Sequence, residues 1–180
     1  MIRVCVPAIN RKEHILSFEV QTAVLAPGVG LCHVTGNLDR VIEETVQVSL
    51  THIKQNPSLL GAARFDLHRT DLHVHLTDGS IVKEGSSAGV GIALALLLAL
   101  SKMRNRGNLA VLATGEIDLY GNIHDVGAVS EKLRYFDKAG AFDYMVVPAA
   151  AKAGKRPNVL AVESVQEMWA GFLAIIGEGK

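Results

Sequence analysis

Two serines lie directly before one of the most apolar stretches of the sequence, in residues 83–100, KEGSSAGVGIALALLLAL. Where a turn ends at the start of a helix, backbone N–H groups point outward, and the helix dipole adds a partial positive charge. Ser86 or Ser87 can therefore be the N-cap of a buried helix. The same position also suits a nucleophilic hydroxyl, because such N–H groups can stabilise the oxyanion that forms when a carbonyl is attacked.

A nucleophilic serine needs a base, and histidine is the usual one. His73 and His75 share one face of the segment DLHVHLT, where they could act as a base or bind a metal. An HxH pair without a third ligand is, however, more often the polar face of a strand. We therefore expect no metal site here.

Lys132 is a better candidate for the base. On a helical wheel of the segment AVSEKLRYFDKA, it falls on the apolar side, between Val129 and Phe136. Burial there would lower the pKa of the ammonium and allow the neutral amine to accept a proton from a serine. The alternative is a lysine that extends its charge from the edge of the apolar face into water.

The elements that must hold these side chains follow from the periodicity of the chain. A period of two predicts strands at residues 15–28, 30–36 and 71–77, and the first two read as a hairpin. Short apolar runs predict strands at 109–113, 143–148 and 158–162, with a tight hairpin at 115–127. Helices are predicted at 37–56, 88–100, 128–139 and 164–176, with Asn37 as an N-cap and Ser164–Glu167 as a capping box. This alternation indicates an α/β (mixed α+β) fold.

Composition limits the classes of function. The chain has 180 residues, 49% of them apolar, which is enough for one globular domain over residues 1–180. Its 18 acidic and 18 basic residues cancel, so no overall field would attract nucleic acid or a membrane surface. Cys5 and Cys32 form no CxxC pair, and the start of the chain lacks a secretory pattern, so we expect a cytoplasmic protein. The apolar run at 88–100 is too short to span a bilayer.

Four segments together resemble the proteolytic domain of the Lon proteases. They are VTGNLDRVIEETVQVSL, LHVHLTDGSIVKEGSSAGVGIALALLLAL, TGEIDLYGNIHDVGAVSEKL and MVVP, in the same order and with similar spacing as in that family, between about Leu16 and Pro148. The resemblance implies a Lon-type proteolytic domain, with small mixed sheets packed against several helices. It also implies a peptidase with a Ser-Lys dyad, which acts on unfolded or delivered polypeptides.

The resemblance assigns roles to individual residues. Ser87, which precedes AG, would be the nucleophile, and Lys132 in SEKL would be the general base. Thr114 in TGEI would orient the lysine, and the backbone N–H groups around Ser87 and Ala88 would stabilise the oxyanion. Three further residues match positions near the family's site without an assigned chemical step: Glu84, His73 and His75.

The chain departs from the family pattern at several positions. Prolines that are common in the family are replaced by Ser86, Val82 and Asp125. A glycine is replaced by Ala128, and a lysine by Ser130. None of these changes removes the dyad. Ser86 leaves the choice of nucleophile between two hydroxyls, and the loop before the helix loses a residue with restricted φ.

The sequence contains no GxxxxGK[ST] segment, so this chain cannot use ATP through a P-loop. It is either part of a longer ATP-driven protease, whose AAA+ ATPase domain is missing here, or a peptidase that acts alone or with a separate ATPase. No cofactor is expected. The resemblance implies polypeptide substrates and a homo-oligomer, commonly a hexameric ring.

Two other classes of function remain. The segment GSSAGVGIALALLLAL also resembles the phosphate loop of small-molecule kinases of the galactokinase and homoserine kinase type, but TGEI and EKL are then unexplained. The second alternative is a non-catalytic binding or assembly module, like the Lon-type domain of the recombination protein RadA. The presence of both Ser87 and Lys132 favours the peptidase.

Overall fold

The computed structural model describes residues 1–9, 14–61, 66–78, 83, 85–103, 105, 108–154 and 156–178. In these residues, seven strands form one mixed sheet with the order β3-β4-β2-β1-β5-β8-β9. The strands are β1 (Arg3–Ile9), β2 (Ile15–Leu25), β3 (Cys32–Thr35), β4 (Asp71–Leu76), β5 (Ala110–Ala113), β8 (Tyr144–Pro148) and β9 (Val159–Val162). A separate antiparallel hairpin consists of β6 (Glu116–Ile117) and β7 (Ile123–His124). The mixed α/β class is confirmed.

All strands of the large sheet except β2 run in the same direction. β2 is antiparallel to β1 on one side and to β4 on the other, whereas β3 and β4, β1 and β5, β5 and β8, and β8 and β9 are parallel pairs. The carboxyl ends of these parallel strands therefore meet at one edge of the sheet. In open α/β sheets, this is the edge where functional residues gather.

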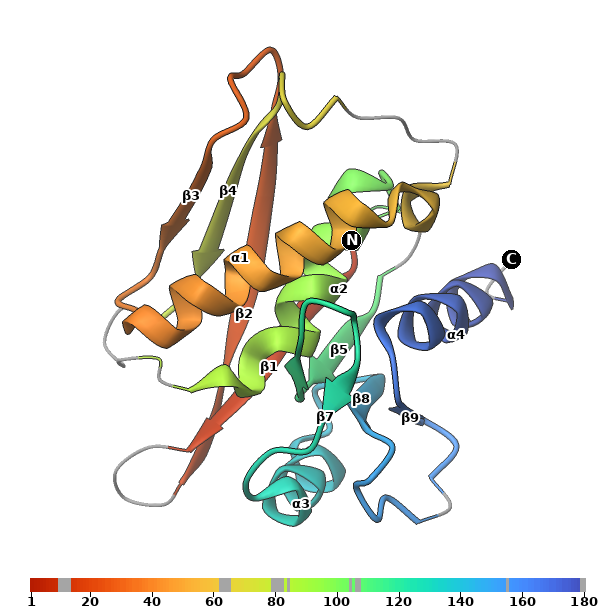
Figure 1. Cartoon of the computed structure of the whole chain (residues 1–180). Helices are drawn as coiled ribbons and strands as arrows, with labels where there is room; N and C mark the ends of the chain where they lie inside the picture. The colour runs from red at the N-terminus through yellow and green to blue at the C-terminus, as the bar shows by residue number, and fades with distance from the viewer. Residues whose placement is uncertain are drawn as a thin grey trace.

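Helices cover both faces of the sheet. The helices α1 (Arg40–Gln55), α2 (Gly89–Leu100) and α4 (Val165–Glu178) share the larger apolar core, with the buried side chains of one sheet face. The helix α3 (Val129–Ala139) packs in a second apolar cluster, with Cys5, Leu112 and Met145. Figure 1 shows α1 lying across β2 and β4, and α3 at the far end of the molecule from the β2–β3 turn. Two short 3-10 helices, η1 (Pro57–Leu60) and η2 (Ser86–Ala88), complete the fold.

The apolar run after the two serines forms the central helix α2. Of its twelve residues, all except Ala99 are buried. Contacts with α1, β1 and β2 surround it, and α4 covers a further side. The prediction of a core helix is confirmed. Among the described residues, the longest apolar helical stretch falls short of what is needed to cross a bilayer.

Gly91 allows α2 to pass close to β1. A Cβ atom at this position would lie 2.5 Å from Cγ2 of Val6, a side chain that is buried in the core. We expect Gly91→Ala to lower the free energy of unfolding by about 1–3 kcal/mol, because the two elements would have to move apart. Denaturant unfolding of the variant tests this. The matched control is Gly127→Ala, since a Cβ atom there would meet nothing within 4 Å.

The predicted hairpin of residues 15–28 and 30–36 is wrong. β4 lies between β2 and β3, paired with both of them. The carboxylate of Asp71, the first residue of β4, accepts hydrogen bonds from the backbone N–H groups of Val29 and Leu31 in the β2–β3 turn, at 2.8 and 2.9 Å. These bonds join the β2–β3 turn to the start of β4, the strand that lies between β2 and β3.

Two further differences concern the ends of elements. Asp39, not Asn37, is the N-cap of α1, since its carboxylate accepts from the N–H of Ile42 at 2.9 Å. Asn37 instead takes a left-handed conformation with φ 56° in the turn before the cap. Half of the predicted capping box of α4 is confirmed, because the hydroxyl of Ser164 accepts from the N–H of Glu167 at 3.1 Å. The carboxylate of Glu167, however, accepts from the N–H of Glu163 at 2.8 Å and not from that of Ser164. The other predicted helices and strands occur within a few residues of their expected limits.

Candidate active site

Three segments meet at the carboxyl edge of the sheet. Thr114 directly follows β5, Ser87 lies in η2 at the start of α2, and Lys132 lies in the first turns of α3. Because α2 and α3 pack on opposite faces of the sheet, only a residue at its edge can touch both helices. Thr114 occupies this position and is fully buried.

Lys132 points inward, as the helical pattern predicted. The side chain is 3% exposed, and its Nζ donates a hydrogen bond to the hydroxyl of Thr114 at 3.0 Å. Burial lowers the pKa of Lys132 from its ordinary value of 10.5 to about 8, while the carboxylate of Asp125 acts in the opposite direction. At pH 7, a pKa of about 8 leaves roughly a tenth of the amine neutral. Lys132 can therefore act as a proton acceptor near neutral pH.

Backbone hydrogen bonds join Ser87 to the segment after β5. Its carbonyl oxygen accepts from the N–H of Gly115 at 3.0 Å and from the hydroxyl of Thr114 at 3.4 Å. The N–H of Val90 in turn donates to the carbonyl of Gly115 at 3.0 Å. Thr114 thus contacts Lys132 through its oxygen and Ser87 through its proton, and it connects the two residues.

Neither serine is a side-chain cap of α2. The N-cap of this helix is Ala88, and η2 precedes it without a side-chain hydrogen bond at its own cap, Gly85. Within the described residues, the hydroxyl of Ser87 has no hydrogen-bond partner. This hydroxyl is therefore available for a ligand as far as the described part of the chain is concerned.

The hydroxyl of Ser86 has a partner. It donates to the carboxylate of Glu116, in β6, at 2.6 Å. This bond ties the turn before the helix to the β6–β7 hairpin, at the position where the Lon pattern commonly has proline. A charge-assisted hydrogen bond and a fixed φ are two different ways of restricting the same turn.

For the peptidase function expected from the sequence, Ser86→Ala should lower the rate of peptide hydrolysis by about 3- to 10-fold, because the turn before Ser87 loses this restraint. Ser86→Pro should keep at least half of the wild-type rate, since the ring restricts the same residue. Steady-state kinetics of the two variants check this. Equal losses in both variants would show that the turn needs the hydroxyl for another reason.

The two histidines lie elsewhere. His73 and His75 alternate with the buried residues of β4 and so lie on the sheet face opposite α1 and α2. Both imidazoles are hydrogen-bonded to the hydroxyl of Thr35, at 2.9 and 2.8 Å. In the described residues, neither contacts Ser87, Thr114 or Lys132. Glu84 lies outside the described residues.

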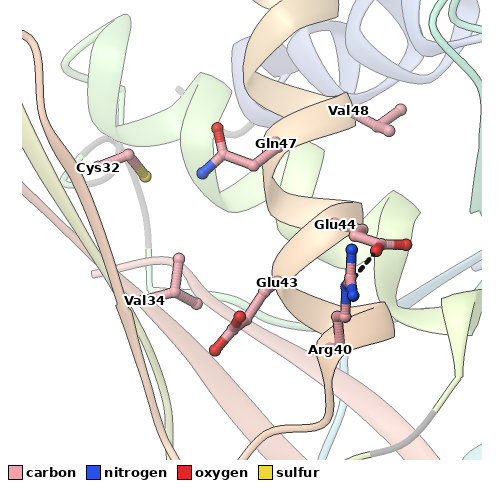
Figure 2. Close-up of a pocket in the computed structure, with 7 residues that line it drawn as sticks. All are labelled: Cys32, Val34, Arg40, Glu43, Glu44, Gln47 and Val48. Carbon is pink, nitrogen blue, oxygen red and sulfur yellow. Dashed lines mark hydrogen bonds and ion pairs between the residues drawn. The ribbon is translucent and has the colours of Figure 1, made fainter.

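A groove on the described surface is separate from this cluster. It has a volume of about 640 Å³ and lies between the edge strand β3 and α1. Figure 2 shows its lining, Cys32, Val34, Arg40, Glu43, Glu44, Gln47 and Val48. None of these residues belongs to the cluster around Lys132. In the part of the chain that the structure describes, no group of three His, Cys, Asp or Glu side chains is placed to hold a metal ion.

Sequence patterns missed three residues that interact with the site or lie close to it along the chain. Glu116 bonds to Ser86, Asp125 raises the pKa of Lys132, and Lys83 is buried four residues before Ser87. Glu116 follows TG within the segment that resembles the Lon proteases, so its position in that segment was the available signal. Asp125 and Lys83 lie in loops, where hydrophobic periodicity carries no information on burial.

The chain is similar in sequence to known proteins. Residues 13–161 match the family model of the Lon protease (S16) C-terminal proteolytic domain. The chain is 40% identical to the Lon protease of Heliobacterium modesticaldum over 126 residues, and 39% identical to that of Malacoplasma penetrans over 121 residues. It is 35% identical to Lon protease 1 of Myxococcus xanthus over 130 residues. These matches cover 70%, 67% and 72% of this chain, but only about 15% of the length of the curated relatives.

Proposed function

Because the chain belongs to the family of the Lon protease (S16) C-terminal proteolytic domain, we propose that it is a serine endopeptidase with a Ser87–Lys132 dyad. Ser87 is the nucleophile and Lys132 is the general base. Thr114 orients the amine, and the N–H groups of Ser87 and Ala88 receive the oxyanion. Glu84, His73 and His75 take no chemical step in this proposal.

One observation carries the proposal: the buried Nζ of Lys132 donates to Thr114, whose hydroxyl donates to the backbone of Ser87. A lysine on an apolar helix face could extend its charge into water, but this one is 3% exposed and bonded to a neutral hydroxyl. A hydroxyl partner does not stabilise the ammonium as a carboxylate would, so the neutral form is accessible. This supports a role as a base near neutral pH.

The reaction has two halves. Neutral Lys132 takes the proton of the Ser87 hydroxyl while Oγ attacks the peptide carbonyl, and the resulting oxyanion accepts hydrogen bonds from backbone N–H groups. The protonated amine then gives its proton to the leaving nitrogen, and the C–N bond breaks to leave an acyl-enzyme. A water molecule then repeats these steps. Lys132 takes a proton from the water, the water oxygen attacks the ester carbonyl, and the Ser87 oxygen leaves with a proton from Lys132.

The remaining parts of the proposal concern the surroundings of this chemistry. The substrates are unfolded or delivered polypeptides, and residues 1–180 form one domain that acts without ATP. An AAA+ ATPase, on a separate chain or elsewhere in a longer one, would deliver folded substrates. The site works in a homo-oligomer in the cytoplasm, and the proposed form of this oligomer is a hexameric ring.

Cleavage of fluorescently labelled casein without ATP tests the proposal, with protein concentration varied so that every oligomeric state is assayed. We expect hydrolysis by the wild type and none by the dyad variants. If the wild type is inactive in every state, the chain is instead a binding module of the Lon fold. That module would bind a partner protein or DNA without cleaving either.

A further inference from the structure

A second lysine is buried at the same edge of the sheet. Lys83 is 1% exposed and is among the largest fully buried side chains of the described residues. Removing an ammonium group from water costs several kcal/mol unless hydrogen bonds replace the lost solvation. An apolar side chain would fill the same space without this cost. The contacts of the ammonium group therefore indicate what it does.

The ammonium group of Lys83 connects the ends of two strands. Nζ donates to the carbonyl oxygen of Gly36, after β3, at 2.7 Å, and to that of Asp78, after β4. It also lies 5.7 Å from the ring centroid of Phe18, within the range of a cation–π interaction. Burial lowers the pKa of Lys83 and the carboxylate of Asp78 raises it. The partners of the charge are thus mainly backbone carbonyls.

The backbone of Lys83 is held as well. Its N–H donates to the carbonyl of Asn37 at 3.2 Å, and its own carbonyl accepts from the N–H of Asp39 at 3.1 Å. Asp39 is the N-cap of α1, so these bonds join residue 83 to the start of that helix. Main chain and side chain together fix Lys83 to three segments of the fold.

This fixed point lies close to the nucleophile along the chain. Ser87 follows Lys83 by four residues, so the two Cα atoms are at most about 14 Å apart. On its other side, Ser87 is bonded to Thr114 and Gly115. Ser87 is therefore bonded to the segment after β5, and Lys83 is a second fixed point four residues before it.

We propose that Lys83 is a positioning residue, whose buried ammonium fixes the turn before Ser87 to the carboxyl edge of β3 and β4 and so aligns the nucleophile with Lys132. The proposal rests on the peptidase function above. Lys83 itself does not contact the reacting atoms. A shift of the nucleophile affects the chemical step more than substrate binding, because catalysis requires near-attack geometry.

Lys83→Met tests this, since methionine is apolar and nearly as long. We expect kcat to fall about 10- to 100-fold with KM changed by less than about threefold. Lys83→Arg, which keeps the charge and the donors, should recover part of kcat. The pH at which the rate is half-maximal should stay the same, because Lys132 keeps its surroundings.

Hydrogen exchange gives a readout that does not depend on activity. In Lys83→Met, amides of residues 86–90 should exchange at least about tenfold faster than in the wild type, while those of β8 should be unchanged. If the variant does not fold, Lys83→Gln replaces it, because an amide can still donate to one carbonyl. The same changes are then expected at a smaller size.

The matched control is Phe172→Leu, a buried change on α4. It should lower the thermal midpoint yet leave kcat within twofold of the wild type. Lys83 is not a positioning residue if its variants keep both kcat and slow exchange at residues 86–90, or if Phe172→Leu lowers kcat as much. An inactive wild type would overturn the peptidase function. The exchange rates would still show whether Lys83 holds residues 86–90 in place.

Discussion

Ser87→Ala should abolish the hydrolysis of casein, with a loss of at least about 10³-fold in kcat. The variant removes the only atom that forms the acyl-enzyme in the proposed mechanism, and alanine suits the first turn before a helix. Folding should persist, since the carbonyl of Ser87, which joins it to Thr114 and Gly115, remains. Initial rates at saturating substrate measure the effect.

Ser86→Ala is the matched control for this result. It removes one hydroxyl from the adjacent residue, whose partner is Glu116, and should cost only the 3- to 10-fold expected above. If Ser86→Ala abolished activity and Ser87→Ala retained it, the nucleophile would have been assigned to the wrong residue. Circular dichroism of both variants separates lost chemistry from lost structure.

Lys132→Met should also abolish hydrolysis, and the wild-type enzyme should show the titration of this amine. The pKa of Lys132 is lowered to about 8 by burial, so kcat/KM should rise with pH through about 8 and level off above it. Lys132→Arg should be inactive at every pH, because a guanidinium stays protonated. Peptide hydrolysis between pH 6 and 10 measures the profile.

Two further variants, one on the same helix and one in the loop before it, show whether the pH profile belongs to Lys132. Lys138→Met, on the exposed side of the same helix, should keep the wild-type rate and profile. Asp125→Asn should move the midpoint to lower pH, because the Asp125 carboxylate raises the pKa of Lys132. A wild-type profile that is flat between pH 6 and 10 would contradict the assignment of Lys132 as the base.

The same pKa shift predicts an effect of Lys132 on stability. In the unfolded chain the amine titrates near 10.5 and in the fold near 8, so between these values the unfolded state binds more protons. The free energy of unfolding should therefore rise with pH through this window, and the cost of burial is fully present below about pH 8. Lys132→Met removes the cost of burying the charged amine and should raise the free energy of unfolding at pH 7 by on the order of 2 kcal/mol.

Denaturant unfolding of the wild type and Lys132→Met at pH 7 and pH 10.5 measures this difference. The gain should be largest at pH 7 and shrink toward pH 10.5, since the amine is then neutral in the fold and already half neutral in the unfolded chain. Lys138→Met serves again as the control, with no pH-dependent change expected. A Lys132→Met variant that is less stable at pH 7 would mean that the Thr114 hydrogen bond outweighs the cost of burial.

Part of the fold could not be predicted from local patterns, and β1 is the clearest case. Val4 and Val6 face one core and Cys5 the other, so the strand is apolar on both sides and shows no alternation with polar residues. Pro7 also weakens a strand prediction, because proline cannot donate to a neighbouring strand. The order of β2, β4 and β3 was equally inaccessible, since β4 pairs with two strands that lie far before it along the chain.

Periodicity placed α1, α3 and α4 and turned Lys132 inward, because the spacing of apolar residues records which side of a helix meets the core. The helix α2 followed instead from its unbroken apolar run. The position of Ser87 at the start of a buried helix was likewise a local property of the sequence. Only the tertiary structure decided three other features of the site region. They are the hydrogen bond from Lys132 to Thr114, the hydrogen bond from Ser86 to Glu116, and the burial of Lys83. Each of these joins segments whose approach depends on strand order and on packing across the sheet, and local periodicity contains no record of either.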